Sequence, residues 1–267
     1  QGLSFQGKAV EGAVCTFLLP YWSLGGEIIR DGKMSFERGK AEAGLNMWRT
    51  MVSEGVAKKN SAEVGTDDTR KEFQAGKVIF GVIWGYAWNH FQGGADTRVK
   101  DKVGVTTLPA MPGGKPVSCM GGWNWSSVAL VRWLSSPEVS KQLALKGSFH
   151  PVFPSVYKDA EVLKAIPWFA DALPVVETAR ARPVTPMYRA ISDALRINTN
   201  TVMAGVKTPQ QALDEIEQRV AREHATAVLG QEREQRELLR RGGIHHEGQP
   251  AVGARPQSPP DGLNQRP

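Results

Sequence analysis

Aromatic side chains gather at two glycine-flanked places in the sequence. Trp84, Tyr86 and Trp88 alternate directly after an apolar run, and Trp123 follows a pair of glycines. On an extended backbone alternate residues share a face, so the first three rings would point the same way. Aromatic rings cover the apolar C–H faces of a pyranose, while polar groups beside them take its hydroxyls. Both places are therefore candidates for a sugar-binding surface.

The glycines at the second place, Gly121 and Gly122, would let the backbone itself come close to a ligand. The alternative for each tryptophan is an ordinary core position, because large aromatic side chains are mostly buried in folded proteins. We assign Trp48, Trp133 and Trp168, which lie outside the two segments, to the core.

The residue types and spacings of common catalytic, metal and cofactor sites are missing from the sequence. The histidines lie at spacings unlike those of metal ligands, and no phosphate loop or nucleophile elbow occurs. Cys15 and Cys119 cannot form a disulfide framework, and we interpret them as two buried thiols. Asp67 and Asp68 are adjacent and would not face each other on a helix. We expect no catalytic residue, no metal and no cofactor.

The elements that must position the aromatic segments can be predicted from periodicity and helix caps. Residues 78–83 form a β-branched and aromatic run that predicts a buried strand leading into Trp84, and residues 103–108 predict a second strand. An apolar stripe that includes Ala41, Leu45 and Trp48 predicts a helix over residues 36–56. Further helices are predicted at 67–73, 135–147, after Asp159, 185–205 and from 208 onward, so the back half is mainly helical.

Composition limits the classes of protein to consider. The chain has 267 residues, of which 41% are hydrophobic, enough for one large domain or two small ones. The net charge of +6 is spread along the chain, which gives no sign of nucleic-acid binding, and no apolar stretch approaches the roughly 20 residues of a membrane span. The first residues read as the middle of a longer protein. The composition of residues 228–267 predicts a disordered tail.

Six segments, taken in order, resemble the sugar-binding proteins of ABC transporters. They include FQGKAVEGAVC (residues 5–15), FQAGKVIFGVIWGYAW (73–88) and SCMGGWNW (118–125), and the resemblance extends over residues 5–29, 73–88, 103–114, 118–125, 134–145 and 180–192. Six ordered segments are far more specific than any one motif. Within the family, the first phrase resembles the trehalose/maltose-binding branch.

The resemblance implies an α/β fold of the two-lobed, type II periplasmic-binding-protein kind, here with an incomplete first lobe and a helix-rich C-terminal half. The segments expected from it are a second-lobe part at residues 1–102, a hinge strand with part of the first lobe at 103–158, C-terminal helices mainly of the second lobe at 159–227, and the tail at 228–267. The family's N-terminal portion has no counterpart here, so we expect an N-terminally truncated protein. About ten residues of the family pattern are also missing after Trp125.

By the same resemblance Trp84, Gly121, Gly122 and Trp123 would line the sugar cleft, and Arg182 would reach sugar hydroxyls; Tyr86 joins them on the geometric argument above. The implied function is that of the sugar-binding component of an ABC carbohydrate importer, without catalysis. It would bind a di- or oligosaccharide such as trehalose or maltose and deliver it to the membrane permease. The implied location is the periplasm or the outer face of the cytoplasmic membrane, where some members are lipoproteins.

Two alternatives remain open at the level of sequence. A carbohydrate-active enzyme of the glycosidase kind would use the same aromatic platforms, but it also needs two carboxylates about 5 to 9.5 Å apart across the scissile bond. No acidic residue here carries a recognisable signal for that role. The other alternative is a non-functional fragment of a binding protein.

Overall fold

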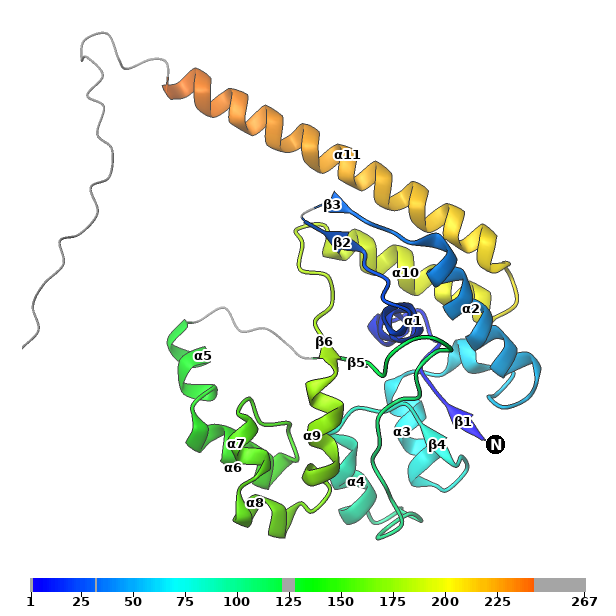
Figure 1. The fold of residues 1–267 in the computed structure, drawn as a ribbon, viewed down its shortest axis with the longest axis vertical. Coiled ribbons are helices and arrows are strands. Elements are labelled where there is room, and N and C mark those ends of the chain that lie inside the picture. The colour runs from blue at the N-terminus through cyan, green and yellow to red at the C-terminus, as the bar shows by residue number, and fades with distance from the viewer. Residues whose placement is uncertain (1, 32, 122–127, 243–267) are drawn as a thin grey trace, which may run out of the picture. The chain divides into compact units, whose positions relative to one another are not determined.

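The computed structural model describes residues 2–31, 33–121 and 128–242, and the chain divides into two units, Gln1–His224 and Ala225–Pro267. The elements, shown in Figure 1, are β1 (Leu3–Ser4), α1 (Glu11–Ser23), β2 (Ile29–Arg30), β3 (Lys33–Met34), α2 (Arg38–Ser53), a 3-10 turn (Ser61–Glu63), α3 (Thr66–Gln74), β4 (Phe80–Gly81), α4 (Ala87–Gly93), β5 (Ser118–Cys119), α5 (Val128–Leu134), α6 (Pro137–Gly147), α7 (Pro154–Tyr157), α8 (Ala160–Ala165), α9 (Phe169–Glu177), β6 (Ala179–Arg180), α10 (Tyr188–Met203) and α11 (Pro209–Gly242).

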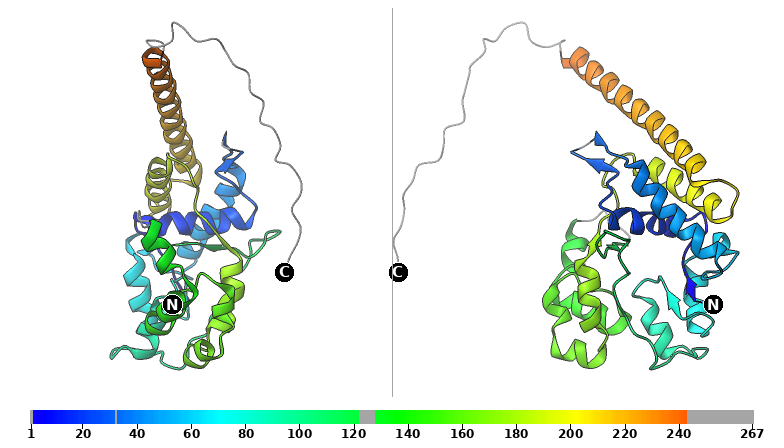
Figure 2. Two further views of the ribbon diagram at one scale, coloured as in Figure 1. Left: turned by 90° about the vertical axis from the view of Figure 1, so that its left-hand side faces the viewer. Right: turned by 45° about the vertical axis from the view of Figure 1, so that its right-hand side comes forward.

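Helix α1 lies at the centre of the larger hydrophobic core. Every residue from Gly12 to Ser23 is buried, as expected for a helix that is apolar on all sides. Helices α2 and α10 pack against it, and the first turns of α11 complete the core, as Figures 1 and 2 show. The predicted stripe of α2 is confirmed, with Ala41, Leu45 and Trp48 buried. This core fixes the position and direction of α1.

A second hydrophobic core is formed by the short helices α6 to α9. Its buried residues include Tyr157, Val162, Trp168 and Phe169. Two predicted helix starts in this region are confirmed, because the Ser136 side chain accepts a hydrogen bond from the backbone N–H of Val139 at 3.4 Å and Asp159 caps α8. The core assignment is confirmed for Trp168 and wrong for Trp133, which is 61% exposed.

Strands are much shorter than the sequence predicts. Among the described residues the strands form three two-residue pairs, β1 with β4, β2 with β3, and β5 with β6. The predicted buried strand over residues 78–83 shrinks to β4, and Ile79 and Phe80 are 72% and 65% exposed. No strand forms over residues 103–108. A β-branched run shows what a strand could bury, but it does not show whether a second layer covers it.

Helix α11 extends into the stretch that composition assigned to a disordered tail. It runs to Gly242, whereas the tail was predicted to begin at residue 228. Glu, Gln, Arg and Leu dominate this stretch of the sequence and are all good helix formers, so helix propensity is the physical reason for the difference. None of the helices in the described part of the chain is both long and apolar enough to cross a membrane.

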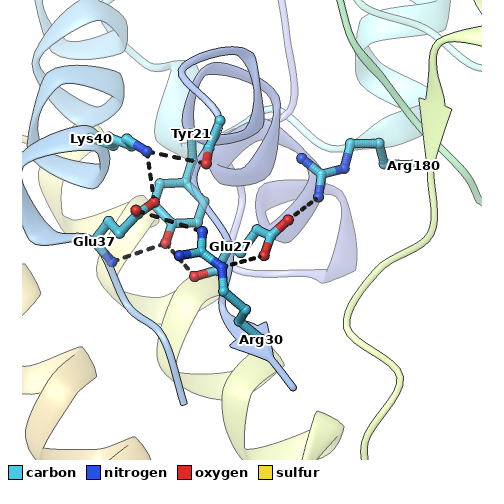
Figure 3. A network of polar contacts seen from close by, with 7 residues as sticks. Tyr21, Glu27, Arg30, Glu37, Lys40 and Arg180 are labelled. Carbon is cyan, nitrogen blue, oxygen red and sulfur yellow. Dashed lines mark hydrogen bonds and ion pairs between the residues drawn. The ribbon is translucent and has the colours of Figure 1, made fainter. Parts of the chain in front are cut away.

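The pair of parallel strands β5 and β6 lies between α1 and the short helices, as Figure 1 shows. A polar network beside the end of α1 holds β6 in place (Figure 3). The Arg180 guanidinium lies 3.5 Å from the Glu27 carboxylate and 5.2 Å from the centre of the Trp22 ring. Tyr21 donates a hydrogen bond to the Glu27 carbonyl, and burial raises the pKa of Tyr21 to about 12, so its hydroxyl stays protonated.

Candidate functional site

The candidate site is organised by the common end of β5 and β6. Cys119 pairs with Arg180, and the Met120 N–H donates to the Arg180 carbonyl at 2.9 Å. Parallel strands finish at the same edge, so Gly121 and Arg182, each two residues beyond this pair, leave it at the same end. The strand pair therefore brings together two of the residues that the resemblance assigned to sugar binding.

Arg182 belongs to a polar cluster centred on Glu11, the first residue of α1. The Arg182 guanidinium and the Tyr188 hydroxyl both donate to Oε1 of Glu11, and the Ser192 hydroxyl donates to Oε2 at 2.6 Å. We call these four residues the Glu11 cluster. The Arg182 side chain is 22% exposed and that of Glu11 is 44% exposed, so the ion pair is in contact with solvent.

The ionisation of the Glu11 cluster follows from its packing. Burial raises the pKa of Tyr188, because a charged tyrosinate would lose its hydration. The hydrogen bond to Glu11 raises it further, because a tyrosinate would be repelled by the carboxylate. Tyr188 therefore stays a neutral donor, and the Arg182 guanidinium also lies over its ring at 5.7 Å from the centre. This arrangement fixes the plane of the guanidinium while donors on it remain at the surface.

Trp84 lies against the chain just beyond β5, at Gly121. A Cβ atom added to Gly121 would lie 2.5 Å from Cζ3 of the Trp84 ring, so the ring covers the backbone at Gly121, where a side chain would not fit. Trp84 itself is partly exposed and Gly121 is exposed. We call residues 84–86 the Trp84 loop. It presents an indole against a bare stretch of backbone.

His150 packs against the Trp84 loop at Gly85. A side chain at Gly85 would collide with the His150 ring. That ring lies among other aromatic rings, at 5.5 Å from Trp168 and 5.9 Å from Phe169, and its Nδ1 is 3.0 Å from the Tyr157 hydroxyl. His150 is exposed on its outer side, yet the desolvation of its packed side lowers the pKa of the imidazole. The loop therefore rests on the second hydrophobic core.

The other rings of this segment do not line up with Trp84. The backbone turns at Gly85 and enters α4 at Ala87, so the predicted alternation of Trp84, Tyr86 and Trp88 on an extended chain is wrong. Trp88 stacks on Trp168 with 5.1 Å between ring centres and belongs to the second core. Tyr86 is partly exposed, and its hydroxyl lies 3.3 Å from Oδ1 of Asp67.

Of the predicted site residues, Gly121 and Arg182 leave the same end of the strand pair, Trp84 lies against Gly121, and Tyr86 belongs to the same loop as Trp84. Gly122 and Trp123 lie outside the described residues. Sequence reasoning missed Glu11, Tyr188 and Ser192. Glu11 lies inside the phrase that carried the resemblance, but its partners are 171 to 181 residues away, a separation at which no local pattern signals a contact.

The chemistry of this arrangement is that of recognition. An indole face, a guanidinium with a fixed orientation and a shared carboxylate can cover an apolar ring and exchange hydrogen bonds with hydroxyls. Within the described ranges no group of three or more His, Cys, Asp or Glu side chains could hold a metal ion.

Known proteins resemble this chain in sequence and in fold. No family profile matches the chain. A probable ABC transporter-binding protein of Deinococcus radiodurans is 34% identical over 83% of this chain and 56% of its own length. A probable amino-acid ABC transporter periplasmic-binding protein of Sinorhizobium fredii is 24% identical over 80% of this chain and 50% of its own length. The chain thus spans about half the length of the curated relatives it matches.

Solved structures give the same picture of the fold. Maltose-bound T. maritima MalE3 matches with a TM-score of 0.73 and 28% identity over 83% of this chain and 60% of that one. A ribitol complex of an ABC transporter solute-binding protein from Agrobacterium radiobacter matches with a TM-score of 0.70 and 23% identity, over 82% of this chain and 58% of that one. These relatives are binding proteins and not enzymes. The chain belongs to the substrate-binding protein family of ABC transporters, and its fold is part of the two-lobed, MalE-like fold.

Proposed function

We propose that this chain binds a carbohydrate at the end of the β5–β6 pair and serves as the sugar-binding component of an ABC importer. The observation that carries the proposal is that the Trp84 ring lies against Gly121, while Arg182, paired with Glu11, follows β6 at the same end of the strand pair. An indole can stack on the C–H face of a pyranose, and the guanidinium and carboxylate can then take hydroxyls at the rim of the same ring.

The arrangement favours a ligand that is partly apolar and densely hydroxylated. An anion without an apolar face would gain little from Trp84, and a purely apolar ligand would cover the Arg182–Glu11 pair without exchanging hydrogen bonds with it. A di- or oligosaccharide such as maltose or trehalose meets both needs, and maltose is the ligand of the MalE3 structure that resembles this chain. The partner would be the ABC permease, and the location the periplasm, as in the name of the S. fredii relative.

The affinity of the chain as it stands is expected to be low. It matches 60% of MalE3, and any hydroxyl contacts made by the unmatched part of such a relative are not supplied by these residues. At roughly 1 kcal/mol for each missing hydrogen bond, the affinity would fall by several powers of ten relative to a binding protein that makes all of these contacts. We therefore expect a Kd of about 1 mM.

Saturation-transfer NMR with maltose and trehalose tests the proposal, because it detects millimolar binding. We expect signal transfer to the sugar ring protons with the parent chain, and a loss of about tenfold in affinity for Trp84→Ala and for Arg182→Ala. Trp133→Ala is the matched control, because Trp133 is an exposed tryptophan of α5 and is not one of the residues of the proposed site. Equal binding by all three variants would contradict the proposed site, and no transfer to either sugar would contradict the ligand class.

A further inference from the structure

The two cysteines, 104 residues apart in the sequence, lie in direct contact. The Cys119 thiol donates to the sulfur of Cys15, and the two Sγ atoms are 3.1 Å apart. Cys15 lies in the second turn of α1 and is 5% exposed, whereas Cys119 ends β5 and is partly exposed. The sequence predicted two buried thiols but gave no sign of a contact between them, so this contact is a finding of the fold alone.

We propose that Cys15 and Cys119 are a reversible redox pair that closes to an intramolecular disulfide joining α1 to β5. The oxidant is a small or protein disulfide. The Cys119 thiolate attacks one of its sulfurs and expels a thiolate, and the Cys15 thiolate then attacks Cys119 and expels the second. The two cysteine thiols lose two electrons and two protons, and the oxidant disulfide is reduced to two thiols.

The structure supports this order of attack. Cys119 is the more exposed member of the pair and meets the oxidant first, while Cys15 is buried and is placed to resolve the mixed disulfide. The hydrogen bond to Cys15 and burial both raise the pKa of the Cys119 thiol, so this thiol is protonated near neutral pH. Formation of the disulfide is therefore slow near neutral pH, and its rate should increase with pH. The periplasmic location proposed above is a compartment where disulfides persist.

The disulfide would act on the end of the strand pair. Cys119 is two residues before Gly121, and Cys15 lies one helical turn after Glu11, so the bond would tie the Glu11 end of α1 to the strand that carries the backbone facing Trp84. The closed loop of about 100 residues is long, and long loops lose the most chain entropy when they are crosslinked. The oxidised chain should therefore hold these two parts of the candidate site in a fixed relation.

The test is a thiol–disulfide equilibrium of the full chain in buffers of reduced and oxidised glutathione. Acid quenching, alkylation with N-ethylmaleimide and intact mass then give the fraction of the crosslinked form, which carries no adduct. We expect the effective concentration of the pair to be about 100-fold or more higher in buffer than in concentrated urea, because the fold brings the thiols together. A peptide map should join the fragments that contain Cys15 and Cys119.

Cys15→Ser and Cys119→Ser serve as controls, and neither should give a crosslinked monomer. The oxidised parent chain should also melt at a higher temperature than the reduced one, and a reductant should abolish that difference. Equal effective concentrations in buffer and in urea would overturn the proposal, as would glutathione adducts at both cysteines or a disulfide-linked dimer as the main product.

Discussion

The Trp84 loop and the Glu11 cluster lie at the same strand end but are held there by different forces. The loop is held by apolar packing on the second core and by the bare backbone at Gly121. The cluster is held by one carboxylate that accepts from three side chains. The loop therefore offers a preformed apolar surface. The cluster has satisfied its own charge, and a ligand must share hydrogen bonds that already exist.

This difference suggests a division of work in recognition. Stacking on a preformed indole costs little reorganisation and accepts many sugars, whereas sharing the Arg182–Glu11 pair requires hydroxyls at the right positions. We therefore expect the loop to contribute affinity and the cluster to contribute selectivity. Each prediction below disturbs one of the two regions.

The largest effect is expected from removing the support of the Trp84 loop. Trp168 is 5% exposed and packs against Trp88, His150 and Phe169, so Trp168→Ala should lower the free energy of unfolding by about 3 kcal/mol or more. Trp133→Ala, at an exposed tryptophan, should change it by less than about 0.5 kcal/mol. Urea denaturation of both variants measures the two values. Similar losses would mean that Trp168 does not hold a packed core.

A smaller effect is expected in the Glu11 cluster. Glu11→Gln removes the charge that pairs with Arg182 and leaves a weaker acceptor for Tyr188, at a cost of about 1 to 2 kcal/mol. Glu54→Gln is the matched control, since Glu54 is exposed at the end of α2, and it should be nearly neutral. The midpoints of urea denaturation give the comparison. A neutral Glu11→Gln would show that the cluster contributes nothing to folding.

The Glu11 cluster should also carry a dependence on alkaline pH. The pKa of Tyr188 is raised in the folded chain above its ordinary value of 10.0, so its contribution to stability is present below pH 10 and is lost as the pH rises above it. Tyr188→Phe lacks this contribution. The difference in urea midpoint between parent and variant should therefore shrink as the pH rises past 10, and a constant difference would argue against a hydrogen-bonded, neutral Tyr188.

The Trp84 loop should respond at the opposite end of the pH scale, and this is the smallest effect. The pKa of His150 is lowered from 6.5, so the unfolded chain takes up a proton that the folded chain resists. Stability contributed by the neutral imidazole is present above pH 6.5 and is lost as the pH falls below it. His150→Gln should be less sensitive to acid than the parent over this range. Identical acid profiles would show that the ring is not desolvated.

Local rules predicted local structure well in this chain. The caps at Ser136 and Asp159 and the capping box in which Thr208 and Gln211 exchange hydrogen bonds all follow from residues three positions apart or fewer. The prediction of strands over residues 78–83 and 103–108 was wrong, because burial in a sheet depends on partner strands that a short stretch of sequence does not contain. The start of α11 was predicted, but its continuation beyond residue 227 was missed because charge was weighed above helix propensity.

The site residues also divide into those that local sequence segments predict and those that depend on long-range contacts. Trp84, Gly121 and Arg182 could be singled out because each belongs to a segment that resembles known sugar-binding proteins. Glu11 could not, because its role depends on contacts across more than 170 residues. The contact between Cys15 and Cys119 has the same origin. Pairings of this kind are decided when the helices and strands assemble, and the sequence pattern around each residue does not record them.

The most direct test of the proposed sugar site is an NMR titration of the chain labelled with ¹⁵N-tryptophan. Its indole N–H signals are assigned with Trp84→Phe and followed against maltose and trehalose up to about 20 mM. We predict a saturable shift of the Trp84 signal and no change for Trp48, whose indole N–H donates to the Thr16 carbonyl inside the core. An unmoved Trp84 signal, or equal shifts for Trp84 and Trp48, would contradict sugar binding at the end of the β5–β6 pair.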